Sequence, residues 1–337
     1  MRHRPRSDPG PLLSHAACEA LHRYTPHTHR ATALLDYSRM PNTDESGPAI
    51  HRERPDDRRE RVARVRARLA AHQLPIPPGS RLARYFELAE RFAAKELSPA
   101  GRGPLRDANE LLEANRDFAE FAVIVEHLLA PHPPADPVVH RKLRLVLGGA
   151  ALPGADANPL ARNTQFELYV AALFQRAGIP TLLREPDGIL TMGAVRLGVA
   201  AKRPGGPAHV ARLVRHGAKQ LRKAGLVGII ALSLDRLFAP NDERVMGRTI
   251  EDLQAAVPTL LDQAVQPLLP TLDHAAAGTP ALALLASLVV PSTVAGVNTV
   301  GFMSAIFLHA FPHRRWTEAQ HAALMHWEQA LQPGSRA

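Results

Sequence analysis

The feature that most constrains the fold is a set of continuous apolar segments that alternate with helical patterns in the second half of the chain. The segments 226–234 and 281–290 carry no charged side chain, and 300–309 carries one histidine. A strand with one solvated face would alternate apolar and polar residues, so these segments predict strands buried on both faces. Helical patterns between them indicate an α/β domain with a central mixed sheet flanked by helices.

The α/β domain is expected to span residues 163–337. Helical periodicity predicts helices at 163–177, 207–224, 249–269 and 317–331, and shorter strands are predicted at 180–184, 187–191 and 195–202.

The preceding residues divide by composition. Residues 1–60 mix proline, histidine and charges without a sustained period, which predicts a mostly disordered tail, and Met40 is an alternative start. Residues 61–146 predict a helical module with helices at 61–72, 80–97 and 108–129, and the glycine-rich residues 147–162 predict a linker.

Several classes of protein are disfavoured by the sequence. No apolar run approaches the roughly 20 residues of a membrane span, and no continuous apolar segment follows Met1 as in a secretory signal. We therefore expect a cytoplasmic protein without membrane association. Cys18 is the one cysteine, which leaves no pair for a disulfide and no cysteine-based zinc site.

Positive charge is concentrated in one part of the chain. The formal net charge is +9, yet residues 1–60 hold 10 arginines against 9 acids. Residues 188–234 contain no Asp or Glu and eight basic residues, among them Arg203. On the helix at 207–224, one face carries Arg212, Arg215, Lys219, Arg222 and Lys223. This face and Arg203 predict contact with a nucleic-acid backbone; a solvated face or an acidic protein partner are the alternatives.

The segment EPDGILTMGAVRLGVAAKRP, residues 185–204, borders this block. Asp187 follows a proline, which suits a strand edge where a carboxylate faces a cleft. Lys202 ends the strand at 195–202, and Ala200 shares its face because side chains alternate along a strand. An acid and a lysine placed in this way suit metal-assisted phosphate chemistry, to which Ala200 offers no ligand. A polar-ended hairpin without chemistry is the alternative.

Two helical residues extend the pattern. Glu167 lies at the border of the apolar stripe of the first helix, where its side chain can reach the sheet, and Gln220 lies at the border of the stripe of the second. Glu167 has an alternative role, because residues 164–167 read Thr-Gln-Phe-Glu, the pattern of a capping box at a helix start.

The order of a helix with Glu167, Pro186-Asp187, Ala200-x-Lys202 and a helix with Gln220 resembles the restriction-endonuclease-like PD-(D/E)XK superfamily. The resemblance covers residues 163–234 and implies a restriction-endonuclease-like fold. It implies that Asp187 and Glu167 hold Mg²⁺ or Mn²⁺, and that Lys202 orients the attacking water. Position 200 departs from the family, which has an acid there. Besides Glu167, Glu185 is a second candidate to replace this missing acid.

The expected function is therefore nucleic-acid binding with a nuclease-like domain that hydrolyses phosphodiesters with Mg²⁺. The alternatives are a catalytically inactive nuclease-fold subunit and a protein-interaction module.

Overall fold

The computed structural model describes residues 32–34, 55–93, 105–132, 135–150, 158–238, 245–294, 300–312, 316–320 and 322–323. All of these residues belong to one compact unit, Ala31–Ala337. Among them no helix has both the length and the apolar character needed to cross a membrane.

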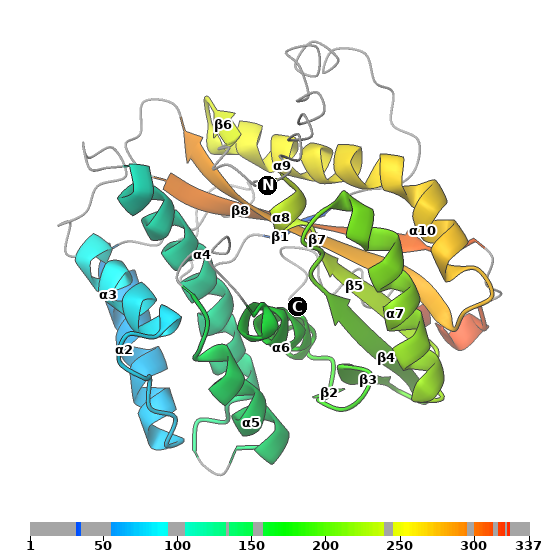
Figure 1. Ribbon diagram of the computed structural model, residues 1–337, viewed down its shortest axis with the longest axis horizontal. Coiled ribbons are helices and arrows are strands. Elements are labelled where there is room, and N and C mark those ends of the chain that lie inside the picture. The colour runs from blue at the N-terminus through cyan, green and yellow to red at the C-terminus, as the bar shows by residue number, and fades with distance from the viewer. Residues whose placement is uncertain are drawn as a thin grey trace, which may run out of the picture. The chain divides into compact units, whose positions relative to one another are not determined.

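Within the described ranges, four helices precede the sheet domain: α2 (Pro55–Ala71), α3 (Arg81–Ala93), α4 (Leu105–Leu128) and α5 (Pro137–Val146). The sequence did not predict α5. Its start is explained by Pro137 at the first helical position, where a missing N–H costs nothing, and by the Asp136 carboxylate, which accepts from the Val138 N–H at 2.7 Å. Helix α5 packs beside α6 (Leu160–Arg176) (Figure 1).

One open, mixed sheet forms the centre of the domain, in the strand order β1-β8-β7-β5-β4-β3-β2, with β6 beside β7. The strands are β1 (Thr32–Leu34), β2 (Thr181–Leu182), β3 (Gly188–Met192), β4 (Val195–Lys202), β5 (Gly228–Ser233), β6 (Val245–Gly247), β7 (Ala281–Val294) and β8 (Val300–Ala310). The strands β2, β3 and β4 are antiparallel neighbours, whereas β4, β5 and β7 run parallel. This is the α/β class with a mixed sheet that the apolar segments predicted.

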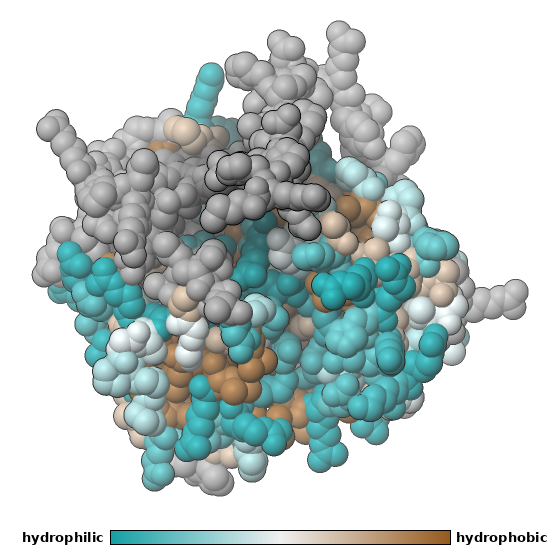
Figure 2. Space-filling view, viewed as in Figure 1, coloured by the Kyte–Doolittle hydropathy of each residue, from teal (hydrophilic) through white to brown (hydrophobic). Residues whose placement is uncertain are grey.

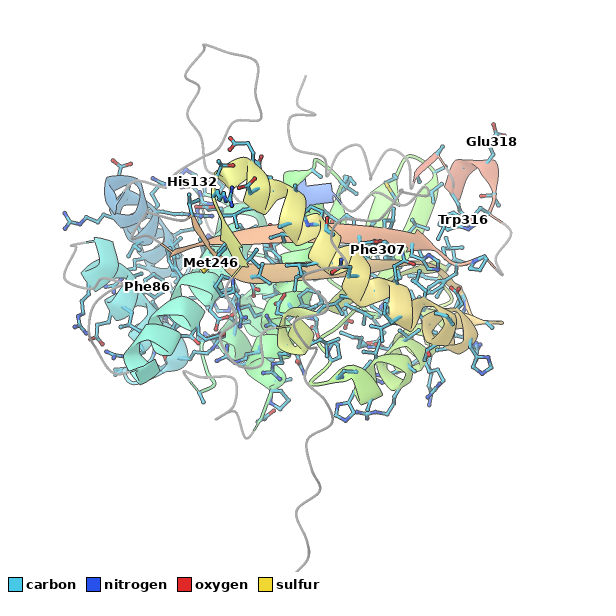
Figure 3. The ribbon with its side chains drawn as sticks, turned by 90° about the horizontal axis from the view of Figure 1, so that it is seen from above. Phe86, His132, Met246, Phe307, Trp316 and Glu318 are labelled. Atoms are coloured by element: carbon cyan, nitrogen blue, oxygen red, sulfur yellow. The ribbon has the colours of Figure 1, made fainter. Side chains whose placement is uncertain are left out.

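The helices cover both faces of the sheet. Ile229 and Ala231 of β5 belong to the apolar cluster formed with α6 and the N-terminal helices. Ile230 and Leu232 belong to the cluster formed with α7 (Val210–Lys223), α9 (Ile250–Val265) and α10 (Leu269–Ala276). Figure 3 shows Phe307 of β8 beneath α9, in this second cluster. Burial of β5 on both faces is confirmed.

The remaining elements are short: α8 (Asp235–Phe238) and two 3₁₀ turns, Pro207–His209 and Gln266–Leu268. The second turn separates α9 from α10, so the helix predicted at 249–269 ends at Val265. Strand β1 and the first residues of α2 fall within residues 1–60, for which the sequence predicted mostly disorder. Of the helix predicted at 317–331, residues 318–320 and 322–323 are helical and the rest lies outside the described residues.

A buried network of charges joins the N-terminal helices to the sheet domain. The Asp117 carboxylate of α4 accepts from Arg81 of α3 at 2.6 Å and from Arg162 of α6 at 2.5 Å. Glu120, one turn further along α4, accepts from Gln165 of α6 at 2.7 Å. Because each charge has an opposite partner, the network can be buried without isolated ions.

Candidate functional site

The antiparallel register of β3 and β4 brings Asp187 to the end of β4. Gly188 is opposite Val199, so Asp187 enters β3 beside the last residues of β4. Its Oδ2 atom accepts from the Ala201 N–H and from Lys202 Nζ, each at 2.9 Å. Lys202 Nζ also donates to the Ala201 carbonyl at 2.8 Å. The structure thus brings together the acid and the lysine that the sequence singled out.

Glu167 extends this site from α6. The helix begins at Leu160 with no side-chain cap, so Thr164 lies in its second turn and the capping box is not formed. Instead, the Glu167 carboxylate accepts from Lys142 Nζ of α5 at 2.6 Å, and about a fifth of each side chain is exposed. Glu167 therefore does not cap the helix, which was the alternative to a role in the site.

The electrostatics of Asp187 show that these side chains interact. Its pKa is raised to about 6, first by burial and then by the negative charge of Glu167, against the lowering effect of the Lys202 ammonium. The Lys142 ammonium lowers it. Two carboxylates and two ammonium groups therefore share one electrostatic environment.

We predict that the Asp187 carboxyl titrates near pH 6, measured by the NMR shift of its carboxyl carbon. Glu167→Gln should lower this pKa, because a negative charge that disfavours ionisation is removed. Glu87→Gln, on the distant helix α3, is the control and should leave the titration unchanged. An Asp187 pKa that is the same in Glu167→Gln and wild type would contradict the shared environment.

Position 200 lies under α7. Ala200 is fully buried in the second apolar cluster, with Val214 and Leu221 as fellow members. A Cβ atom added to Gly217 of α7 would lie 3.2 Å from the Ala200 Cβ, which shows how closely helix and strand pack. Val199 and Ala201 belong to the opposite cluster, because side chains alternate along a strand. A carboxylate at position 200 would have no space without moving α7.

Two amide side chains on α6 and α7 have buried oxygen atoms without a hydrogen-bond partner among the described residues. Gln220 of α7 donates through Nε2 to the carbonyl of Pro186 at 3.2 Å, while its buried Oε1 has no hydrogen-bond partner among the described residues. The buried Oδ1 of Asn163 likewise has none. Asn163 lies four residues before Glu167 on α6, and residues at that spacing are neighbours on one helix face.

The basic face of α7 is exposed as predicted. It consists of Arg212, Arg215, Lys219, Arg222 and Lys223. Arg222 donates to the Gly278 carbonyl at 3.3 Å, and within the described part of the chain none of the five forms an ion pair. Figure 2 shows hydrophilic side chains over the region where α7 lies in Figure 1. These charges are available to an anionic partner.

Arg203 differs from the other predicted nucleic-acid contacts. Its side chain is buried and donates to Asp235 at 3.0 Å, to Glu120 at 3.4 Å and to the Arg162 carbonyl at 3.3 Å. Because its guanidinium faces the protein interior, Arg203 is part of the buried charge network and not of the exposed basic face.

Sequence reasoning missed Lys142. Lys142 lies on α5, which the sequence did not predict, and is 25 residues from its partner. Glu185, the other acid considered, is exposed, and no contact of its side chain is recorded among the described residues.

The donor atoms fit a hard divalent cation in chemistry. Asp187 Oδ1 accepts no hydrogen bond from the described residues, and Glu167 adds a second carboxylate. Mg²⁺ commonly takes one or two carboxylates and completes its coordination with water and substrate oxygens. The described residues contain no group of three or more His, Cys, Asp or Glu arranged for a metal, so other oxygens would have to complete the shell.

The candidate site therefore contains two partly buried carboxylate–lysine pairs, Asp187–Lys202 and Glu167–Lys142. The charges of the second pair affect the pKa of Asp187, and the same domain carries the exposed basic face of α7. Comparisons with protein-family models, with curated proteins and with solved structures find no match for this chain.

Proposed function

We propose that this protein binds nucleic acid and hydrolyses phosphodiesters at a site of the restriction-endonuclease-like PD-(D/E)XK type, with Mg²⁺ or Mn²⁺. One observation carries the proposal: the Asp187 carboxylate meets Lys202 Nζ at 2.9 Å while the charge of Glu167 acts on it. The contact of Asp187 with Lys202 and the electrostatic effect of Glu167 on Asp187 support this proposal.

The topology around these residues supports the same proposal. Helix α6 with Glu167 precedes the antiparallel strands β2, β3 and β4, and Asp187 and Lys202 flank the β3–β4 pair. Helix α7, which bears Gln220, then leads to β5, parallel to β4. The motif residues follow the order of elements on which the resemblance rests.

In the proposed reaction, Asp187 and Glu167 would hold the cation, which would polarise the phosphate and lower the pKa of a bound water. Lys202 has three N–H donors, of which two are used by Asp187 and the Ala201 carbonyl. The third is available to orient the attacking water. Gln220, which donates to the Pro186 carbonyl, would fix the approach to Asp187.

The basic face of α7 would position the nucleic-acid backbone. Arg212, Arg215, Lys219 and Arg222 recur every three or four positions, and with Lys223 they give a stripe about 16 Å long at the rise of an α-helix. Phosphate contacts of this kind give affinity without base recognition.

We predict that Arg215→Gln/Lys219→Gln weakens oligonucleotide binding and reduces the slope of log affinity against log salt by about 2, since each phosphate contact contributes roughly one unit. Fluorescence anisotropy over a salt series measures this slope. The control Arg59→Gln/Arg64→Gln, on the exposed face of α2, should leave it unchanged. Equal slopes in all three proteins would favour an acidic protein as the partner of α7.

Catalysis is tested by incubating labelled single- and double-stranded DNA and RNA with the protein and Mg²⁺ or Mn²⁺. We expect cleavage by the wild type, and loss of cleavage with retained nucleic-acid binding in Asp187→Asn and Lys202→Met. Binding without cleavage in the wild type would favour the second candidate, an inactive nuclease-fold subunit. The inactive-subunit function is favoured by Ala200, which supplies no metal ligand and is packed under α7.

A further inference from the structure

The contact between Lys142 and Glu167 joins the N-terminal helices to the proposed site. Lys142 Nζ lies 2.6 Å from Glu167 Oε2. Helix α5 is held against its neighbours by the buried residues Val139, Leu143 and Val146, and its start is capped by Asp136. The backbone that carries Lys142 is thus fixed by apolar packing that is independent of the ion pair itself.

Each carboxylate of the proposed site already has a positive partner from the protein itself. Lys142 neutralises Glu167, Lys202 neutralises Asp187, and the Lys142 ammonium also acts on Asp187. A divalent cation bound by both carboxylates would have the Lys142 ammonium close to it, because this ammonium is hydrogen-bonded to Glu167, one of the two ligands of the cation. Like charges in a partly buried site repel strongly, because water screens them poorly.

We propose that Lys142 is a positioning residue that competes with a divalent cation for Glu167. In the protein without metal it holds the Glu167 carboxylate in place. When the cation binds, the ammonium releases Glu167 and becomes a contact for a phosphate oxygen of the nucleic acid. This inference rests on the proposed function, and it assigns to the N-terminal helices a direct part in the site.

The competition predicts opposite effects of one substitution on two ligands. Lys142→Met keeps the length of the side chain and removes its charge, so Mn²⁺ should bind about tenfold more tightly than to the wild type, measured by isothermal titration calorimetry. In saturating Mn²⁺, the same variant should bind an oligonucleotide several-fold more weakly, because a phosphate contact is lost. A structural role alone would not raise the affinity for Mn²⁺.

Three variants complete the experiment. Arg144→Met, on the same helix and exposed, removes a charge that has no recorded contact with Glu167 and should leave Mn²⁺ binding unchanged. Lys142→Arg retains the charge and should keep the wild-type affinity, which separates charge from folding defects. Asp187→Ala should abolish Mn²⁺ binding and thereby locate the ion.

The outcomes separate this inference from the proposed function. Mn²⁺ binding that is lost in Asp187→Ala but equal or weaker in Lys142→Met would overturn the competition and leave the metal site standing. Binding by Lys142→Met alone would support the competition in its strongest form. If neither the wild type nor any variant binds Mn²⁺, the metal-dependent function fails and the competition fails with it.

Discussion

Replacing Asp117 with asparagine should lower the free energy of unfolding by about 3–5 kcal/mol. The fully buried carboxylate accepts from Arg81 at 2.6 Å and from Arg162 at 2.5 Å, and both guanidinium groups are almost fully buried themselves. Asparagine keeps the volume and removes the charge, so two buried cations would lose their shared counter-ion. Urea unfolding followed by circular dichroism measures the change.

The direction of the Asp117 pKa gives this prediction a pH dependence. Burial alone would raise the pKa, but the Arg162 and Arg81 guanidinium groups outweigh it and hold the pKa well below the usual range. The folded state therefore binds this proton less readily than the unfolded state. The stabilisation is present above about pH 4 and is lost as the pH falls below the unfolded pKa toward the folded one.

The control for Asp117 is Glu87→Gln, which removes an exposed partner of Arg84 on α3. Exposed pairs contribute about 0–1 kcal/mol, so this variant should unfold almost as the wild type does. A loss below about 1 kcal/mol for Asp117→Asn would show that the network is not a main source of stability.

The fold class could be predicted because hydrophobic patterning reports burial directly. The apolar run of β5 has no polar face, and the structure indeed covers both of its sides. Two short elements, α5 and β1, were not predicted from the pattern. Helix α5 depends on Asp136 and Pro137 at its start, and β1 depends on pairing with β8, some 270 residues away. Strand β1 has three residues and therefore no pattern of its own, whereas the buried Val139, Leu143 and Val146 of α5 do recur at helical spacing, a signal that sequence reasoning missed.

The site was predictable only as far as its residues follow one another along the chain. Asp187 directly precedes β3 and Lys202 ends β4, the two strands of one hairpin, so their spacing in sequence determines their contact. Lys142 meets Glu167 through the packing of two helices, which spacing does not encode. Arg203 shows the opposite failure. Its place in a basic segment predicted a surface charge, but its side chain is buried and forms ion pairs with Glu120 and Asp235.

In the PD-(D/E)XK family an acid stands two residues before the lysine, where this chain has Ala200. The variant Ala200→Asp tests whether an acid at this position can be accommodated and can bind a metal ion. We expect this variant to lose about 3–5 kcal/mol of unfolding free energy, because the carboxylate would be buried among apolar side chains without a partner. It should not gain affinity for Mn²⁺, since α7 separates position 200 from solvent. Urea unfolding and calorimetry measure the two effects.

Ala194→Asp is the matched control, because the same change falls at an exposed residue in the β3–β4 turn. It should change stability by less than about 0.5 kcal/mol. If instead Ala200→Asp folds stably and binds Mn²⁺ more tightly, position 200 opens toward Asp187, and the alanine marks a ligand lost from a working site. If the variant is destabilised as expected, Gly217 and Ala200 form a close helix–strand contact, and any cation would depend on Asp187 and Glu167.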